Sequence, residues 1–197
     1  MPIRDWKKEI YTIPNMLSIF RLILIPVYVY IYINATEAYH YAIAAGILAV
    51  SCLTDMIDGK IARKFNMIST LGKILDPVAD KATQLTMIIC LSVTYPALHA
   101  LLALFLVKES FQLIAGLLNL RKGKMLDGAL VSGKVSTTVL FISLIVLVMF
   151  PNIDPTAMWI ITRICAVFLL IAFIDYIRAY YGKNTKVHDL DDTKGKN

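Results

Sequence analysis

The sequence predicts an all-α, multi-pass membrane protein with six transmembrane helices, because long apolar stretches repeat along the chain and basic residues alternate between its connections. Of the 197 residues, 58% are hydrophobic, and the mean hydropathy is +0.67. A helix that crosses a bilayer needs roughly 20 mostly apolar residues. Segments such as FISLIVLVMF show no polar face, which argues against a soluble helical core. Stretches of suitable length lie near 13–34, 38–60, 74–95, 97–118, 131–150 and 156–180.

The six predicted helices follow one another with recognisable boundaries. The first begins at Pro14, a residue favoured in the first turn of a helix. The apolar run behind it is too long for a cleavable signal peptide. Most connections are short, so we expect consecutive helices to be antiparallel neighbours. Two connections are longer and polar, one between the second and third helices and one between the fourth and fifth.

Lysine and arginine orient the predicted helices. Basic residues precede the first helix, lie in the two long connections, and follow the sixth helix, whereas the other three connections contain none. Because cytoplasmic connections carry the excess of basic residues, both termini are predicted to be cytoplasmic, in a protein of the cell membrane. The formal charge of +6 is therefore a topology signal, and no nucleic-acid partner is predicted.

The predicted domain organisation is simple. Residues 1–182 form one membrane domain with a short amphipathic N-terminal lead-in, in which Trp6 and Tyr11 suit the membrane interface. Residues 183–197 are charged, contain almost no apolar side chains, and are predicted to be a disordered polar tail. The three cysteines show no metal-binding spacing and are interpreted as packing residues.

Four aspartates stand where two predicted helices meet the cytoplasmic connection between them. Asp55 and Asp58 are three residues apart at the end of the second helix, and Asp76 and Asp80 are four apart at the start of the third. Each pair therefore shares one helical face. Antiparallel packing would bring the pairs together, where four like charges repel strongly unless a divalent cation binds them. Oxygen ligands without Cys or His favour Mg²⁺, Mn²⁺ or Ca²⁺ over Zn²⁺.

The residues around the aspartates suit a phosphate ligand. Gly59, Ala62 and Gly72 keep the facing helices small, so that a ligand can approach the backbone closely. Arg63 offers a planar charged group that matches phosphate geometry.

Three other readings of the aspartates stay open from the residues alone. They can be simple charges at helix ends, part of an ion-coupled carrier, or the metal site of a membrane prenyltransferase. A carrier usually has a broken helix at mid-membrane, which is not seen in this sequence. Prenyltransferase motifs lie on well-separated helices, whereas both pairs here fall on consecutive ones.

The whole constellation resembles the signature of the CDP-alcohol phosphatidyltransferases. The resemblance covers about residues 13–180 and is strongest over 53–83. All eight signature positions are filled, with the original spacing, by Asp55, Asp58, Gly59, Ala62, Arg63, Gly72, Asp76 and Asp80.

The resemblance implies an enzyme that transfers a phosphatidyl group from CDP-diacylglycerol to a small polar or lipid alcohol acceptor and releases CMP. It implies two Mg²⁺ or Mn²⁺ ions held by the four aspartates, with Asp80 also acting as general base. Gly59, Ala62, Arg63 and Gly72 would line the nucleotide site. The resemblance further implies an active site facing the cytoplasm, a role in phospholipid biosynthesis, and a homodimer.

The acceptor is the open part of this interpretation. The opening IPNMLSIFRLILIP resembles the phosphatidylglycerophosphate synthase branch, which implies glycerol-3-phosphate as acceptor. Lys134 is the candidate for its phosphate, with Lys108 and Arg21 as further candidates. That branch tends to carry a second basic residue where this chain has Ser136. The cardiolipin synthase branch, which uses phosphatidylglycerol, is therefore the alternative.

Overall fold

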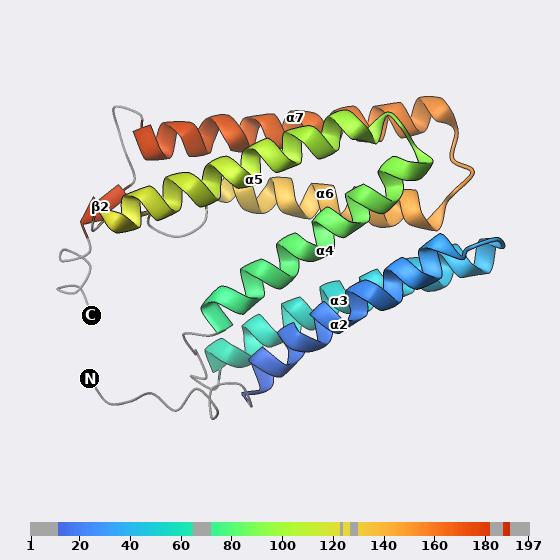
Figure 1. Cartoon of the computed structure of the whole chain (residues 1–197), viewed down its shortest axis with the longest axis horizontal. Coiled ribbons are helices and arrows are strands. Elements are labelled where there is room, and N and C mark those ends of the chain that lie inside the picture. Colours follow the sequence, from blue (N-terminus) through green and yellow to red (C-terminus); the bar gives the residue numbers. More distant parts are fainter. Residues whose placement is uncertain (1–11, 65–71, 123, 127–129, 182–186, 190–197) are drawn as a thin grey trace. The chain divides into compact units, whose positions relative to one another are not determined.

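The computed structural model describes residues 12–64, 72–122, 124–126, 130–181 and 187–189; within these ranges, the side chains of 13–14, 55–64, 72–74, 124–126 and 187–189 are outside the description (Figure 1). The described chain is helical apart from two three-residue strands, so the predicted all-α class is confirmed. The elements are α2 (Ile13–Ile33), α3 (Ala38–Lys64), α4 (Gly72–Thr94), α5 (Leu98–Arg121), β1 (Lys124–Leu126), α6 (Val131–Met149), α7 (Pro155–Tyr181) and β2 (Val187–Asp189).

The described chain has a helix at each of the six stretches that hydropathy predicted, but not all six meet the length and composition of a membrane span. Among the described residues, four segments are long and apolar enough to cross a membrane: Asn15–Ile33, Leu98–Arg121, Val131–Met149 and Pro155–Tyr181. The apolar part of α3, Ala38–Thr54, is shorter. Many large apolar side chains on these helices are exposed, as expected where lipid is the solvent.

The chain packs as two compact units. The first contains Met1–Thr94 and Leu144–Ile153, and the second contains Tyr95–Ser143 and Asp154–Asn197. The sequence analysis predicts one domain over residues 1–182. The predicted boundary at 182–183 falls outside the described residues.

In the first unit, α2 packs against both α3 and α4. Its helices alternate in direction, so the start of α2, the end of α3 and the start of α4 lie at one end of the unit (Figure 1). Buried side chains from all three helices form the core, among them Tyr28, Leu48 and Leu91. At the opposite end, the hydroxyl oxygens of Tyr32 and Thr94 lie 2.9 Å apart and tie α2 to α4.

In the second unit, α5 packs against α7. The rings of Phe111 and Phe173 meet edge to face, with centroids 5.3 Å apart. Asp154 caps α7, because its carboxylate accepts hydrogen bonds from the backbone N–H groups of Thr156 at 2.9 Å and Ala157 at 3.2 Å. The bond from Ala157, followed by those from Thr156, lowers the pKa of Asp154. The cap therefore contributes to the stability of the folded protein at neutral pH, and this stabilisation is lost as pH falls through the lowered pKa.

The two short strands are a difference from the sequence prediction. β1 and β2 pair antiparallel, with Met125 opposite His188. Part of the segment predicted as a disordered tail is therefore ordered. The reason is that Val187–Asp189 finds the backbone of Lys124–Leu126 as a hydrogen-bonding partner, which composition does not reveal.

Candidate active site

Two of the four predicted ligands, Asp76 and Asp80, lie half-buried on one face of α4, near its first residue. The hydroxyl of Ser18, on α2, donates a hydrogen bond to Oδ1 of Asp76. This bond joins residues 58 positions apart and places the second turn of α2 directly against the first turns of α4. The predicted face of α4 is therefore turned toward α2.

A stripe of buried polar residues lies on one face of the first half of α2. Asn15 and Ser18 are completely buried and Arg21 is 2% exposed, although the rest of the helix is apolar. The three residues are spaced by three, so they share one face. Buried polar groups are costly unless they meet other polar groups, which indicates that this face looks into a polar region.

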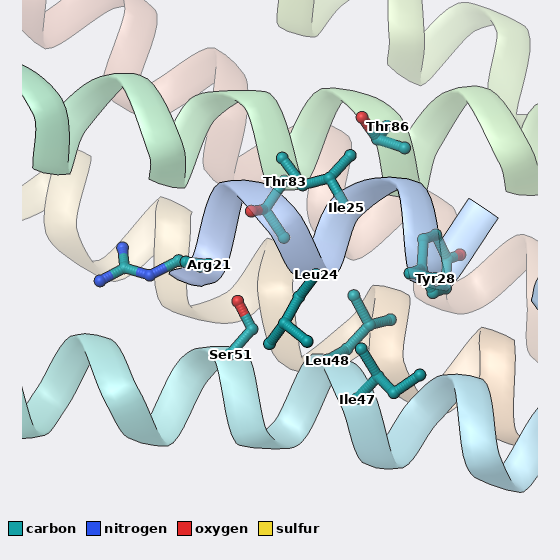
Figure 2. Close-up of a pocket in the computed structure, with 9 residues that line it drawn as sticks. All are labelled: Arg21, Leu24, Ile25, Tyr28, Ile47, Leu48, Ser51, Thr83 and Thr86. Carbon is teal, nitrogen blue, oxygen red and sulfur yellow. The ribbon is translucent and has the colours of Figure 1, made fainter. Parts of the chain in front are cut away.

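A small cavity marks where the three helices meet. Figure 2 shows α2 running between α3 and α4, with Arg21 of α2, Ser51 of α3 and Thr83 of α4 around the cavity. The Arg21 side chain extends toward the end at which α2 begins (Figure 2). The free space, about 10 Å³, is that of roughly one water molecule. The hydroxyl of Ser51 is buried there and has no hydrogen-bond partner among the residues that the structure describes.

The residues around the cavity show that the predicted aspartates lie on the helix faces that border it. Thr83 lies three residues after Asp80, on the face that carries Asp76 and Asp80. Ser51 lies four residues before Asp55 and seven before Asp58, so the backbone positions of these aspartates continue the face of α3 that borders the cavity. The side chains of these two aspartates are outside the described residues.

The other signature positions are described only in part. Gly59, Ala62 and Arg63 lie in the last turns of α3, and Gly72 is the first residue of α4. Their backbone is thus at the same end of the unit as Asp76 (Figure 1). The side chains of Ala62 and Arg63 are outside the described residues, so their predicted contacts with a nucleotide stay predictions.

The second unit contains a buried cation. Lys108 is 2% exposed, and its Nζ lies 2.6 Å from Oε1 of Glu109. The same Nζ is 5.6 Å from the centre of the Tyr176 ring. An ammonium group is expensive to bury, so a carboxylate and an aromatic face are the partners it needs.

Within the described part of the chain, several buried polar atoms near the start of α6 have no hydrogen-bond partner: Oγ of Ser132, Oγ of Ser136 and, on α5, Oε1 of Gln112. By contrast, the Lys134 side chain is exposed on this helix. Of the two lysines considered for the acceptor phosphate, the structure therefore buries Lys108 and leaves Lys134 on the surface. The sequence analysis favours Lys134 over Lys108 because it shows where each lysine lies in a motif but not which of the two is buried.

Gly133 permits the close packing of Tyr176. A Cβ at position 133 would lie 2.7 Å from the Tyr176 hydroxyl oxygen and 2.9 Å from its Cε2. Because Tyr176 is only 3% exposed, its ring has little room to move. We expect Gly133→Ala to destabilise the protein by about 1–3 kcal/mol, measured as a lower midpoint of thermal unfolding in detergent.

Gly46→Ala is the matched control for this prediction. Gly46 also lies inside a helix, but a Cβ there meets no atom within 4 Å. The control should leave the midpoint unchanged or raise it, since alanine favours helix more than glycine does. Equal behaviour of the two variants would contradict the proposed packing of Tyr176.

Asn15 and Ser18 are residues of this site that sequence reasoning missed. The available signal was their spacing with Arg21 in a strongly apolar helix, which indicates a buried polar stripe. The sequence analysis assigns a candidate role to Arg21 in this opening but none to Asn15 or Ser18.

Comparison with known proteins identifies a family model that matches this chain and several proteins that are similar to it. A family model described as CDP-alcohol phosphatidyltransferase matches residues 11–176. The CDP-diacylglycerol–glycerol-3-phosphate 3-phosphatidyltransferase of Aquifex aeolicus is 30% identical over 171 residues, which cover 83% of this chain and 93% of that protein. The cardiolipin synthase (CMP-forming) of Homo sapiens is 41% identical over 113 residues, 56% of this chain and 36% of that protein.

Higher identities occur over shorter segments. A putative cardiolipin synthase of Mycobacterium tuberculosis is 44% identical over 80 residues, 41% of this chain and 37% of that protein. The chain therefore spans little more than a third of the length of these cardiolipin synthases, in contrast to its match with the Aquifex protein.

Proposed function

The chain belongs to the CDP-alcohol phosphatidyltransferase family, and from that premise we propose that it transfers the phosphatidyl group of CDP-diacylglycerol to glycerol-3-phosphate, releasing CMP. The observation that carries the proposal is that Asp76 and Asp80 share one face of α4 where α2, α3 and α4 meet, around a small cavity. The faces that border it also carry Asp76 and Asp80 on α4 and the backbone positions of Asp55 and Asp58 on α3.

The donor atoms at this end fit a hard divalent cation. Asp76 and Asp80 are half-buried carboxylates on neighbouring turns, and no histidine or cysteine accompanies them in the described part of α4's first turns. We assign Asp55, Asp58, Asp76 and Asp80 as ligands of two Mg²⁺ or Mn²⁺ ions. When bound, these ions supply charge neutralisation for the pyrophosphate and for the departing CMP.

The chain's own residues then have defined tasks. Gly59, Ala62 and Gly72 leave room for the nucleotide, and Arg63 contacts its phosphates. The acceptor hydroxyl oxygen attacks the phosphorus that bears the diacylglycerol, and the bond from that phosphorus to CMP breaks. Asp80 takes the hydroxyl proton as general base. The products are the phosphatidyl ester and CMP.

Support for glycerol-3-phosphate comes from the extent of the Aquifex match, which covers most of both chains. Lys108 and Lys134 are the proposed cations for the acceptor's phosphate, with Lys108 the buried one. The second candidate acceptor is phosphatidylglycerol. It is favoured by the higher local identity to cardiolipin synthases and by the neutral, buried Ser136 near the start of α6.

The membrane arrangement is also part of the proposal. We place all six helices across the cell membrane, with both termini and the aspartates on the cytoplasmic side, as the alternation of basic residues predicts. There the donor's headgroup meets the site while its acyl chains stay in the bilayer. We further propose that the protein acts as a homodimer in phospholipid biosynthesis.

The test is a panel of acceptors offered to the purified protein with CDP-diacylglycerol and Mg²⁺ or Mn²⁺. Release of CMP should occur with glycerol-3-phosphate and should stop when EDTA removes the metal. A control reaction without acceptor measures hydrolysis by water.

Other results would redirect the assignment. CMP release only with phosphatidylglycerol would select the cardiolipin synthase reaction. Release of inorganic pyrophosphate from a prenyl diphosphate would indicate a prenyltransferase. Metal binding with no nucleotide product from any acceptor would favour a carrier, and full activity in EDTA would exclude the metal site.

A further inference from the structure

The Ser18 hydroxyl behaves differently from several other hydroxyls on these helices. Thr83 and Thr162 donate to the backbone carbonyls of Ala79 and Met158, four residues earlier in the same helix. This is the usual arrangement, because a hydroxyl inside a helix finds its own backbone nearest. Ser18 instead donates to the carboxylate of Asp76 on another helix.

The surroundings of this bond make it strong. The Ser18 donor is completely buried, the Asp76 acceptor is half-buried, and the acceptor is a carboxylate, so the hydrogen bond is charge-assisted. A bond of this kind restricts rotation of the Asp76 carboxylate. It occupies one lone pair of Oδ1 and leaves the other carboxylate lone pairs available to a cation.

From this geometry we propose that Ser18 is a positioning residue, which holds the Asp76 carboxylate in the orientation needed to bind the divalent cation. The inference rests on the proposed function, because that function makes Asp76 a ligand. In this reading α2 forms the third wall of the site, between the two helices that carry the aspartates (Figure 2).

The size of the expected effect follows from known metal sites. Ligating carboxylates are commonly held by a further hydrogen bond, and removing that partner typically lowers metal affinity by about 10- to 100-fold. A bond that merely ties α2 to α4 would affect thermal stability but would leave metal affinity unchanged. Metal affinity is therefore the measurement that separates the two roles.

The experiment titrates Mn²⁺ alone into the purified full-length protein, with free Mn²⁺ followed by electron paramagnetic resonance. Ser18→Ala should raise the Mn²⁺ dissociation constant about 10- to 100-fold. Ser18→Thr keeps the hydroxyl and should retain most of the affinity. In the CMP-release assay, Ser18→Ala should need more Mn²⁺ for half-maximal rate and should recover turnover when Mn²⁺ is saturating.

The matched control is Ser92→Ala, another buried serine, whose hydroxyl bonds the carbonyl of Ile89 within α4. It should bind Mn²⁺ like the unmodified protein. Unchanged Mn²⁺ affinity in Ser18→Ala, with normal affinity in the unmodified protein, would overturn the role of Ser18 alone. If the unmodified protein binds no Mn²⁺, the proposed metal site fails, and this inference fails with it. If Ser18→Ala does not fold, loss of affinity in folded Ser18→Thr would also count against the proposal.

Discussion

Asp80→Asn is expected to lower the turnover number for CMP release by about 10²- to 10⁴-fold, the usual contribution of a general base. The amide has nearly the same shape as the carboxylate but does not accept the proton of the acceptor hydroxyl. Asp80 is half-buried on α4, so an isosteric change should leave the helix in place. The measurement is the initial rate of CMP release with both substrates and Mn²⁺ saturating.

Asp154→Asn is the matched control for this loss of activity. It makes the same chemical change at an exposed residue that caps α7, and asparagine caps helices about as well as aspartate. Its turnover should be that of the unmodified protein. Normal turnover in Asp80→Asn at saturating Mn²⁺ would remove Asp80 from the role of base.

Lys108→Met is expected to cause the largest loss of stability. Removing the ammonium group leaves the Glu109 carboxylate, whose side chain is 19% exposed, without its partner at 2.6 Å. Breaking a buried ion pair in this way typically costs about 3–5 kcal/mol. The change should appear as a large fall in the midpoint of thermal unfolding in detergent.

The double variant Lys108→Met/Glu109→Gln separates structure from acceptor binding. Without either charge, the midpoint should return close to that of the unmodified protein. If Lys108 contacts the acceptor's phosphate, the KM for glycerol-3-phosphate should still be about 10- to 100-fold higher, as expected for a lost hydrogen bond to a charged group. A normal KM in the double variant would limit Lys108 to a structural role.

Local properties of the chain predicted most of the fold. Helix content and the apolar segments follow from the hydropathy of consecutive residues, and the four strongly apolar segments confirm that interpretation. The shared face of Asp76 and Asp80 follows from a spacing of four residues on a helix. The ordering of Val187–Asp189 was not predicted, because a short strand depends on a partner supplied by a distant part of the chain.

The chemical types at the candidate site were therefore readable from the chain, since hydropathy and helical spacing are carried by neighbouring residues. Which helix stands between the aspartate-bearing helices is a different kind of information. Only the packed structure shows that α2 lies between them and that Ser18 contacts Asp76. A contact between residues 58 positions apart cannot be predicted from local periodicity. In the same way, only packing decided that Lys108 is buried while Lys134 is exposed, since burial depends on how each helix is rotated against its neighbours.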